Sequence, residues 1–166
     1  PHKTPFAAMH VRRGDKLTDG VQPRALKDYV AHLRRLFPKL SRVLLMTDDP
    51  AVIEETSQYP GIHFHWTQFN RSKRPESALS PAEREATAVN SLLNLFLAVD
   101  ADALIGTASS TWFMLLALLS YGKYAEPIPA HSLDIPWEMR ASTATRTQPQ
   151  LGQDLTSNLT SPRSDQ

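Results

Sequence analysis

The sequence predicts an α/β fold, with a doubly wound, Rossmann-like parallel sheet, from the way its apolar residues are spaced. Short apolar runs of strand length alternate four times with segments of helical periodicity. The run at residues 42–47 is almost continuously apolar, as expected for a strand that is buried on both faces of a parallel sheet. Right-handed crossovers between such strands place helices on both faces. For the strand order 3-2-1-4, ligands bind at the carboxyl ends of the first and fourth strands.

Composition sets limits on the function. The chain has 166 residues, of which 41% are hydrophobic, and this suits one domain with a tail. The net charge of +1 does not indicate a broadly basic surface, so we expect no nucleic-acid partner. The absence of cysteine excludes disulfides, thiol catalysis and cysteine-ligated metals.

The predicted domain covers residues 1–140. Residues 141–166 are rich in Ser, Thr, Gln and Asp, and we expect them to form a disordered tail. No signal peptide opens the chain, and no apolar run approaches the roughly 20 residues that cross a bilayer. Because the chain starts at Pro1 and soon enters a strand, we expect a fragment whose N-terminal portion, with any targeting signal, is missing.

The first half of the chain gives three strands and two helices. A first strand ends at Val11, and a helix is expected to open near Pro23 and to stop at Pro38. The second strand covers residues 42–47, and the third covers residues 62–66.

Two polar features accompany these elements. Asp49 followed by Pro50 is typical of a helix start, which predicts a short helix to about Ser57. His63 and His65 share one face of the third strand. With no third ligand nearby in sequence, we interpret them as ordinary strand residues rather than metal ligands.

The second half begins with the capping-box spacing of Ser80 and Glu83, which predicts a long helix. Its inward side chains are expected to be Val89, Leu92, Leu93, Phe96 and Leu97. A fourth strand covers residues 103–107. The helix at residues 111–121, ending at Gly122, is apolar nearly all round and is therefore expected to be buried. The proline-rich segment 126–136 is expected to pass over the surface.

Two polar clusters fall at the predicted binding edge. Arg12, Arg13 and Lys16 follow the first strand, and these side chains suit a phosphate or pyrophosphate. Because side chains alternate along a strand, only one of the two arginines can face a given ligand squarely. Ser109 and Ser110 precede a helix, whose first amides and hydroxyls form a second anion site. The alternatives are a solvated strand end and simple helix capping.

Asp48 and Asp49 end the second strand beside these clusters. We interpret Asp49 mainly as a helix cap, which leaves Asp48 as the better candidate for contacting a ligand. The chain has neither the glycine fingerprint of dinucleotide-binding enzymes nor a P-loop. The remaining reading is a sheet that binds a nucleotide diphosphate, as a sugar-nucleotide transferase would.

Four segments resemble motifs of the α1,6-fucosyltransferases, the family of the N-glycan core enzyme and of rhizobial NodZ. The segments are residues 10–16 (HVRRGDK), 42–50 (RVLLMTDDP), 101–110 (ADALIGTASS) and 131–134 (HSLD). They occur in the family's order and with approximately its spacing. The resemblance covers about residues 6–135.

The resemblance implies the C-terminal, donor-binding half of a GT-B glycosyltransferase. The donor would be GDP-fucose, and no metal and no other cofactor would be needed. His10 and Arg12 would contact the nucleotide and the β-phosphate, Arg13 would support them, and Ser110 would hold phosphate. The reaction would be an inverting transfer of fucose, with Arg12 among the catalytic residues.

This chain departs from the family motifs at two functional positions. The family's proposed base is a glutamate in a relay with a lysine, and the matching position here is Gly20. Asp19 would then serve as the base, with Lys16 as its partner. A guanine-binding aspartate of the family aligns with Asn94, which keeps hydrogen bonding but loses the charge-assisted part.

The resemblance also implies partners and a location. The acceptor would be an oligosaccharide or a glycoprotein, and membrane attachment would come only through a missing N-terminal anchor. The location would be the Golgi lumen in a eukaryote and the cytoplasm otherwise. The alternatives are a protein O-fucosyltransferase-like enzyme and a nucleotide-sugar-binding pseudo-enzyme without turnover.

Overall fold

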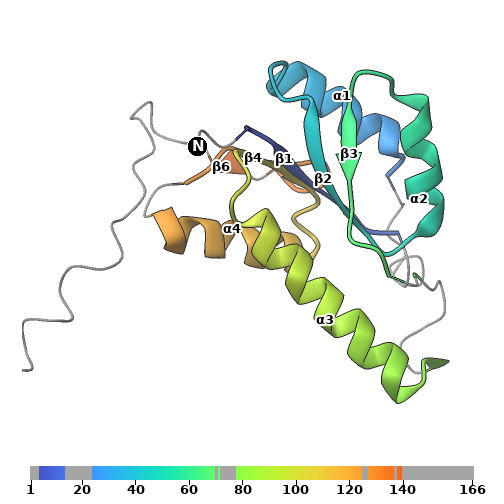
Figure 1. The fold of residues 1–166 in the computed structure, drawn as a ribbon. Helices are drawn as coiled ribbons and strands as arrows, with labels where there is room; N and C mark the ends of the chain where they lie inside the picture. The colour runs from blue at the N-terminus through green and yellow to red at the C-terminus, as the bar shows by residue number, and fades with distance from the viewer. Residues whose placement is uncertain are drawn as a thin grey trace, which may run out of the picture.

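The computed structural model describes residues 4–13, 24–69, 71, 78–124, 127–136 and 138–139. They form an α/β fold around one sheet with the strand order β3-β2-β1-β4-β5-β6 (Figure 1). The strands are β1 (Ala7–Val11), β2 (Arg42–Thr47), β3 (His63–His65), β4 (Ala103–Gly106), β5 (Ala130–Ser132) and β6 (Glu138–Met139). Strands β1 to β5 are parallel, and β6 pairs antiparallel with β5. The predicted doubly wound fold and the order 3-2-1-4 are confirmed.

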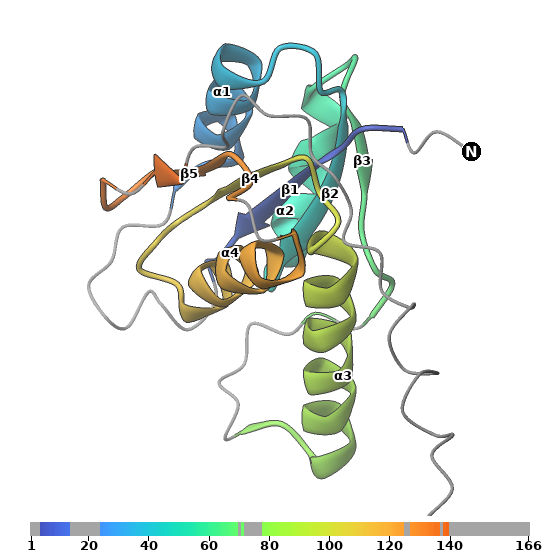
Figure 2. The same cartoon turned by 90° about the vertical axis from the view of Figure 1, so that its left-hand side faces the viewer.

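Helices cover both faces of the sheet (Figures 1 and 2). The helices are α1 (Leu26–Leu36), α2 (Pro50–Glu55), α3 (Pro81–Ala98) and α4 (Thr111–Tyr124), and a 3₁₀ turn, η2 (Thr56–Gln58), extends α2. One core cluster joins α1 and α2 to one face of the sheet, and a second joins α3 and α4 to the other.

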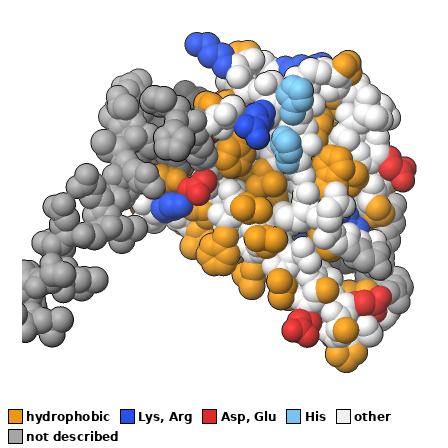
Figure 3. All heavy atoms as spheres, viewed as in Figure 1, with side chains coloured by type: hydrophobic (Ala, Val, Ile, Leu, Met, Phe, Trp, Pro, Cys, Tyr) orange, Lys and Arg blue, Asp and Glu red, His pale blue; other side chains and the backbone are white. Residues whose placement is uncertain are grey.

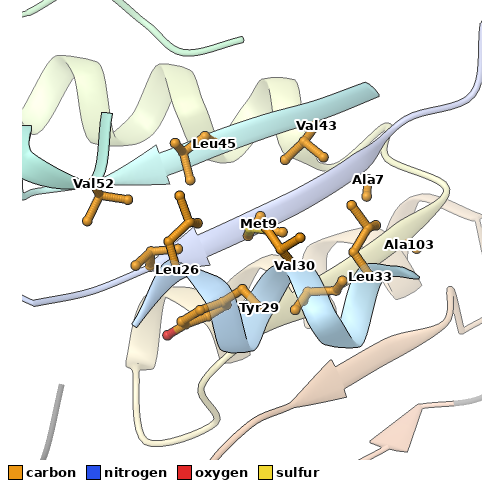
Figure 4. Packing of buried hydrophobic residues seen from close by; sticks show 12 residues of the cluster. Ala7, Met9, Leu26, Tyr29, Val30, Leu33, Val43, Leu45, Val52 and Ala103 are labelled. Carbon is orange, nitrogen blue, oxygen red and sulfur yellow. The ribbon is translucent and has the colours of Figure 1, made fainter. Parts of the chain in front are cut away.

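The alternation of side chains along β1 builds both cores. Ala7, Met9 and Val11 point toward α1, whereas Ala8 belongs to the core under α3 and α4. Figure 4 shows Leu26 and other α1 side chains packed on Met9 and its neighbours. Each fully buried side chain of this size stabilises the fold by about 1.5–3 kcal/mol.

Two predicted helix caps are present. Asp49 caps α2, because its Oδ1 accepts a hydrogen bond of 3.0 Å from the amide of Ala51. Ser80 and Glu83 form the capping box at the start of α3. The start of α1 at Leu26 lies three residues after the predicted one, and Pro23 lies outside the described residues.

The predicted inward face of α3 is wrong. The buried residues of this helix are Asn94, Leu95 and Ala98. The side chains that we expected inside are 46% to 65% exposed. The C-terminal half of α3 is apolar on two opposite faces at 3.6 residues per turn. The structure buries the face that carries the small Ala98, which allows close approach to the second core.

The prediction that α4 is buried all round is also wrong, and the helix continues past Gly122 to Tyr124. Phe113, Leu116 and Ala117 face the core, while other apolar side chains point outward. We call the exposed apolar surface of both helices the α3–α4 face. It consists of Val89, Leu92, Leu93, Phe96, Leu97, Leu115, Leu118, Leu119 and Tyr121. Of the described helices, none has both the length and the apolarity to cross a membrane.

The segment 126–136 was wrongly predicted to run over the surface. Ala130–Ser132 instead forms β5 beside β4, and Ile128 and Ala130 are buried. The amide of Leu104 donates to the carbonyl of Pro129 at 2.8 Å. A three-residue strand flanked by proline is too short to show a period, so the sequence pattern could not reveal it.

Gly106, the last residue of β4, should tolerate no side chain. A Cβ atom there would lie 2.2 Å from a ring carbon of Phe113, a buried core residue. Gly106→Ala should therefore lower the free energy of unfolding by about 1–3 kcal/mol in urea denaturation.

Gly122→Ala is the matched control, because nothing lies within 4 Å of its added Cβ and the position is inside α4. This variant should be unchanged or more stable by about 0.5–1 kcal/mol. Equal stability of Gly106→Ala and the unmodified chain would contradict the close contact.

Candidate anion site at the carboxyl edge of the sheet

The site lies where β1 and β4 end side by side. Their parallel pairing runs from Ala7 opposite Ala103 to Met9 opposite Ile105. From β1 the chain continues to β2 and β3 on one side of β1, and the later strands β4 and β5 lie on its other side. The junction of β1 and β4 is therefore the topological switch point. Arg12 directly follows β1, and Ser110 directly precedes α4 after β4. The structure thus brings the two predicted clusters to adjacent strands.

Arg13 is held by the protein itself. Its Nη1 and Nη2 atoms donate to the two carboxylate oxygens of Glu55 at 2.5 and 3.0 Å, and its Nε donates to the carbonyl of Arg24 at 3.2 Å. The hydrogen bonds to Glu55 raise the pKa of Arg13. This bidentate pair joins the end of β1 to α2 and to the segment before α1. The Arg13 side chain therefore lies on the α1–α2 side of the sheet.

Arg12 lies on the other side of the chain. Because side chains alternate, Arg12 continues the row of Ala8 and His10, which belongs to the α3–α4 side. The prediction that the two arginines point to opposite faces is consistent with the partners of Arg13. Of the two guanidinium groups, that of Arg12 is the better placed for a ligand at the switch point.

His10 is a neutral group at this site. Its pKa is lowered to about 4, mainly by burial and to a smaller extent by the positive charge of Arg12, while the negative charge of Asp48 acts in the opposite direction. Its buried Nδ1 has no hydrogen-bond partner among the described residues. A neutral imidazole has one donor and one acceptor nitrogen, which suits the edge of a nucleobase better than a phosphate.

Asp48 and Asp49 have distinct roles. Asp48 Oδ1 accepts the amide hydrogen of Arg13 at 3.0 Å, which ties the end of β2 to the loop after β1. Asp49 is buried and caps α2, as described above. The capping interpretation of Asp49 is confirmed, and Asp48 lies close enough to His10 to affect its charge.

Asn94 is buried on the inner side of α3, near the end of β3. Its Oδ1 accepts a hydrogen bond of 3.1 Å from the hydroxyl of Thr67. Asn94, His10 and Arg12 all belong to the α3–α4 side of the sheet. The amide nitrogen of Asn94 remains a donor that could meet a ligand.

Arg71 joins this edge of the sheet, and sequence reasoning missed it. Its Nε donates to the carbonyl of Thr47 at 3.0 Å, and its Nη2 donates to the carbonyl of Thr67 at 2.9 Å. Its guanidinium carbon lies 4.2 Å from the ring centre of Phe69. Burial lowers the pKa of Arg71, and its partners in the described part of the chain are carbonyl oxygens and this ring.

Thr47, which accepts from Arg71, pairs with Val11 across β1 and β2. The guanidinium of Arg71 therefore lies near the strand end that carries Arg12. A partly buried cation held by carbonyl oxygens favours an anion nearby, because burial of a charge is costly without a counter-charge. The segment 67–79 is mostly polar with mixed charge. Arg71 is therefore identified by its burial and contacts, and the sequence pattern does not distinguish it.

The turn after β4 differs from the expectation of free amides. Asp134 Oδ1 accepts from the amide of Ala108 at 2.8 Å, and Oδ2 accepts from the amide of Ser109 at 3.3 Å. Ser132 Oγ donates to Asp134 at 2.8 Å and also accepts from Ala108 at 3.0 Å. The amides of Ala108 and Ser109, in the turn just before α4, therefore bind a carboxylate of the same chain.

Burial raises the pKa of Asp134, but the hydrogen bonds from Ser109, Ser132, Ile135 and Ala108 outweigh it and lower the pKa overall. Ser110 is buried at the start of α4, where the first amides of a helix have no partner within it. The serine hydroxyls and these amides are the groups of this turn that can donate hydrogen bonds to an anion.

Lys16 and Asp19, the predicted catalytic pair, lie outside the described residues, as do Gly20 and the predicted tail. Their roles therefore stay predictions. Among the residues that the structure does describe, no three His, Asp or Glu side chains come together as metal ligands do.

Comparison with known proteins gives no assignment, since no protein-family model and no curated protein matches this chain.

The carboxylate of Asp134 should stabilise the fold. Asp134→Asn keeps the shape but loses the charge-assisted hydrogen bonds, so it should cost about 1–2 kcal/mol of unfolding free energy at pH 7. Because the folded pKa lies below the unfolded value, this stabilisation is present above about pH 4 and is lost as the pH falls through the lowered pKa. Urea denaturation from pH 7 down to pH 3 measures both effects.

Glu85→Gln makes the same charge change at an exposed position of α3 and should stay within about 0.5 kcal/mol of the unmodified chain. A difference between Asp134→Asn and the unmodified chain that does not shrink in acid would contradict the role given to the carboxylate.

Proposed function

We propose that this chain binds the diphosphate of a nucleotide sugar at the junction of β1 and β4, with GDP-fucose as the donor. As the donor-binding part of a GT-B, α1,6-fucosyltransferase-like enzyme, it would transfer fucose with inversion and without a metal ion. The observation that carries this proposal is the placement of Arg12 and the start of α4 on adjacent parallel strands at the switch point. The family motifs of residues 10–16, 42–50, 101–110 and 131–134 supply the identity of the donor.

Three groups of the chain would supply positive potential to the diphosphate. Arg12 offers a guanidinium from the end of β1, and Arg71 offers a second from beside the end of β2. Ser110 and the first amides of α4 add a helix N-terminus. Because Asp134 already occupies two amides of this turn, the arginines carry more of the charge neutralisation than the motif alone suggests.

The nucleobase would lie on the α3–α4 side of the sheet. His10 stays neutral at physiological pH and can both donate and accept, and Asn94 keeps a donor nitrogen. The base edge of guanine presents both hydrogen-bond donors and acceptors, and His10 and Asn94 together offer the acceptors and donors that would pair with them.

The chemical step follows from the donor. The acceptor oxygen would form a bond to the anomeric carbon while the bond from that carbon to the β-phosphate oxygen breaks, and GDP leaves with the electron pair. Arg12 and Arg71 would stabilise the negative charge that develops on the departing diphosphate. The hydroxyl proton would pass to Asp19, with Lys16 as its partner.

A binding module without turnover is the second candidate, and the contacts of Asp134 favour it. A carboxylate at the turn after β4 lowers the positive potential available to a leaving diphosphate. Incubation with GDP-fucose and a glycan acceptor separates the two: transfer supports the enzyme, whereas tight GDP binding without transfer or donor hydrolysis supports the binding module.

Calorimetric titration with GDP tests the site. Arg12→Ala and Arg71→Ala should each weaken binding by about 10- to 100-fold, because each removes charge-assisted hydrogen bonds worth about 1.5–3 kcal/mol. Both losses should shrink at high salt.

Arg42→Ala is the control, since Arg42 opens β2 at the opposite edge of the sheet and is exposed. Its affinity for GDP should equal that of the unmodified chain. Equal effects of all three substitutions, or no effect of Arg12→Ala, would remove the site from the switch point.

A further inference from the structure

The α3–α4 face, defined above, is an apolar surface on the outer side of two neighbouring helices. Its side chains are 36% to 65% exposed, and Figure 3 shows hydrophobic side chains gathered over α3 and α4. The same helices share a core beneath it, where Leu95 and Ala98 of α3 pack near Leu116 and Ala117 of α4. The face is therefore held on a rigid base.

The size of this face is that of one half of a stable protein interface. Taking the exposed fractions of its nine side chains, we obtain roughly 800 Å² of apolar surface. The largest apolar patch of a typical monomer is about 300–600 Å², and a standard interface buries about 800 Å² on each partner. Exposure of this much apolar surface to water is unfavourable, at about 25 cal/mol per Å².

The charge pattern favours a partner like the face itself. No charged residue occurs between Glu85 and Asp100, or between Asp102 and Lys123, so the centre of the face is uncharged. At one end Lys123 is paired with Asp100, and at the other Arg84 lies beside Glu85. An acidic or basic partner would find no counter-charge in the centre of the face. The two basic residues of these helices, Arg84 and Lys123, lie at its ends and form no basic row along it of the kind that membrane-binding helices carry.

We infer that the α3–α4 face is the interface of a homodimer, in which two copies of this chain pack α3 and α4 against each other about a twofold axis. An apolar, uncharged face is complementary to a second copy of itself. In a twofold dimer both copies use the same face, so no apolar interface remains exposed for further association. The net charge of +1 opposes association only weakly. The interface lies on the outer side of α3 and α4, whereas the anion site lies at the strand ends, so this inference does not depend on the proposed function.

Sedimentation velocity over about 1–100 µM chain tests the inference. The unmodified chain should be dimeric within this range, since interfaces of this size have micromolar or tighter affinity. Phe96→Glu and Leu118→Glu each place a charge in the centre of the face and should weaken the dimer by roughly 100-fold. Ile135→Glu, at an exposed apolar residue outside the face, is the matched control and should leave the dimer intact.

Single cysteines give a second readout that does not depend on weakening the dimer. The chain has no cysteine, so Phe96→Cys should form an intermolecular disulfide on oxidation at a rate far above that of Gln58→Cys, which lies on η2 at the other side of the sheet. A monomer at 100 µM would overturn the inference, as would equal crosslinking of the two cysteine variants. Sedimentation of the monomer with phosphatidylcholine vesicles, lost in Phe96→Glu, would assign the face to lipid instead.

Discussion

The parallel pairing of β1 with β4 is the constraint on which the site depends. It is fixed at the amino end by reciprocal contacts, since the amide of Phe6 donates to a carboxylate oxygen of Asp102 and the amide of Asp102 donates to the carbonyl of Phe6, both at 2.9 Å. The strands then run in register until both end at the same edge. Without this register, the loop that carries Arg12 and the turn that carries Ser110 would not be neighbours. The sheet therefore creates the site before any ligand contributes to it.

Charge distribution decides what each arginine can do. Arg13 is neutralised by Glu55, so it joins the end of β1 to α2, and a ligand would gain little from its charge. Arg71 is held by carbonyl oxygens and an aromatic ring among the described residues, which fixes its position without cancelling its charge. Asp134 acts in the opposite sense, because it adds negative charge beside the turn after β4. The candidate site thus combines positively and negatively charged groups.

The sequence predicted four strands of the sheet and both helix caps, because these depend on local periodicity and capping chemistry within 5 to 20 residues. The order of those four strands was a premise taken from the doubly wound fold class, and the observed pairing agrees with it. It could not select the buried face of α3, since two opposite faces of that helix are apolar and only packing distinguishes them. It also missed β5 and the contacts of Asp134, which arise from strand pairing between residues about 25 positions apart. Arg71 was hidden in a polar segment for the same reason: its burial is a tertiary property.

We propose that a nucleoside diphosphate binds where β1 and β4 end. Backbone amide shifts in ¹H–¹⁵N spectra, recorded during titration of the full chain with GDP, test this most directly. We expect the amides of Arg12, Ser110 and Thr111 to shift together and to saturate at one stoichiometric equivalent, while those of Phe6, Arg42 and Ala103 at the opposite edge stay in place. Shifts confined to that opposite edge, or a spectrum that GDP leaves unchanged, would contradict it.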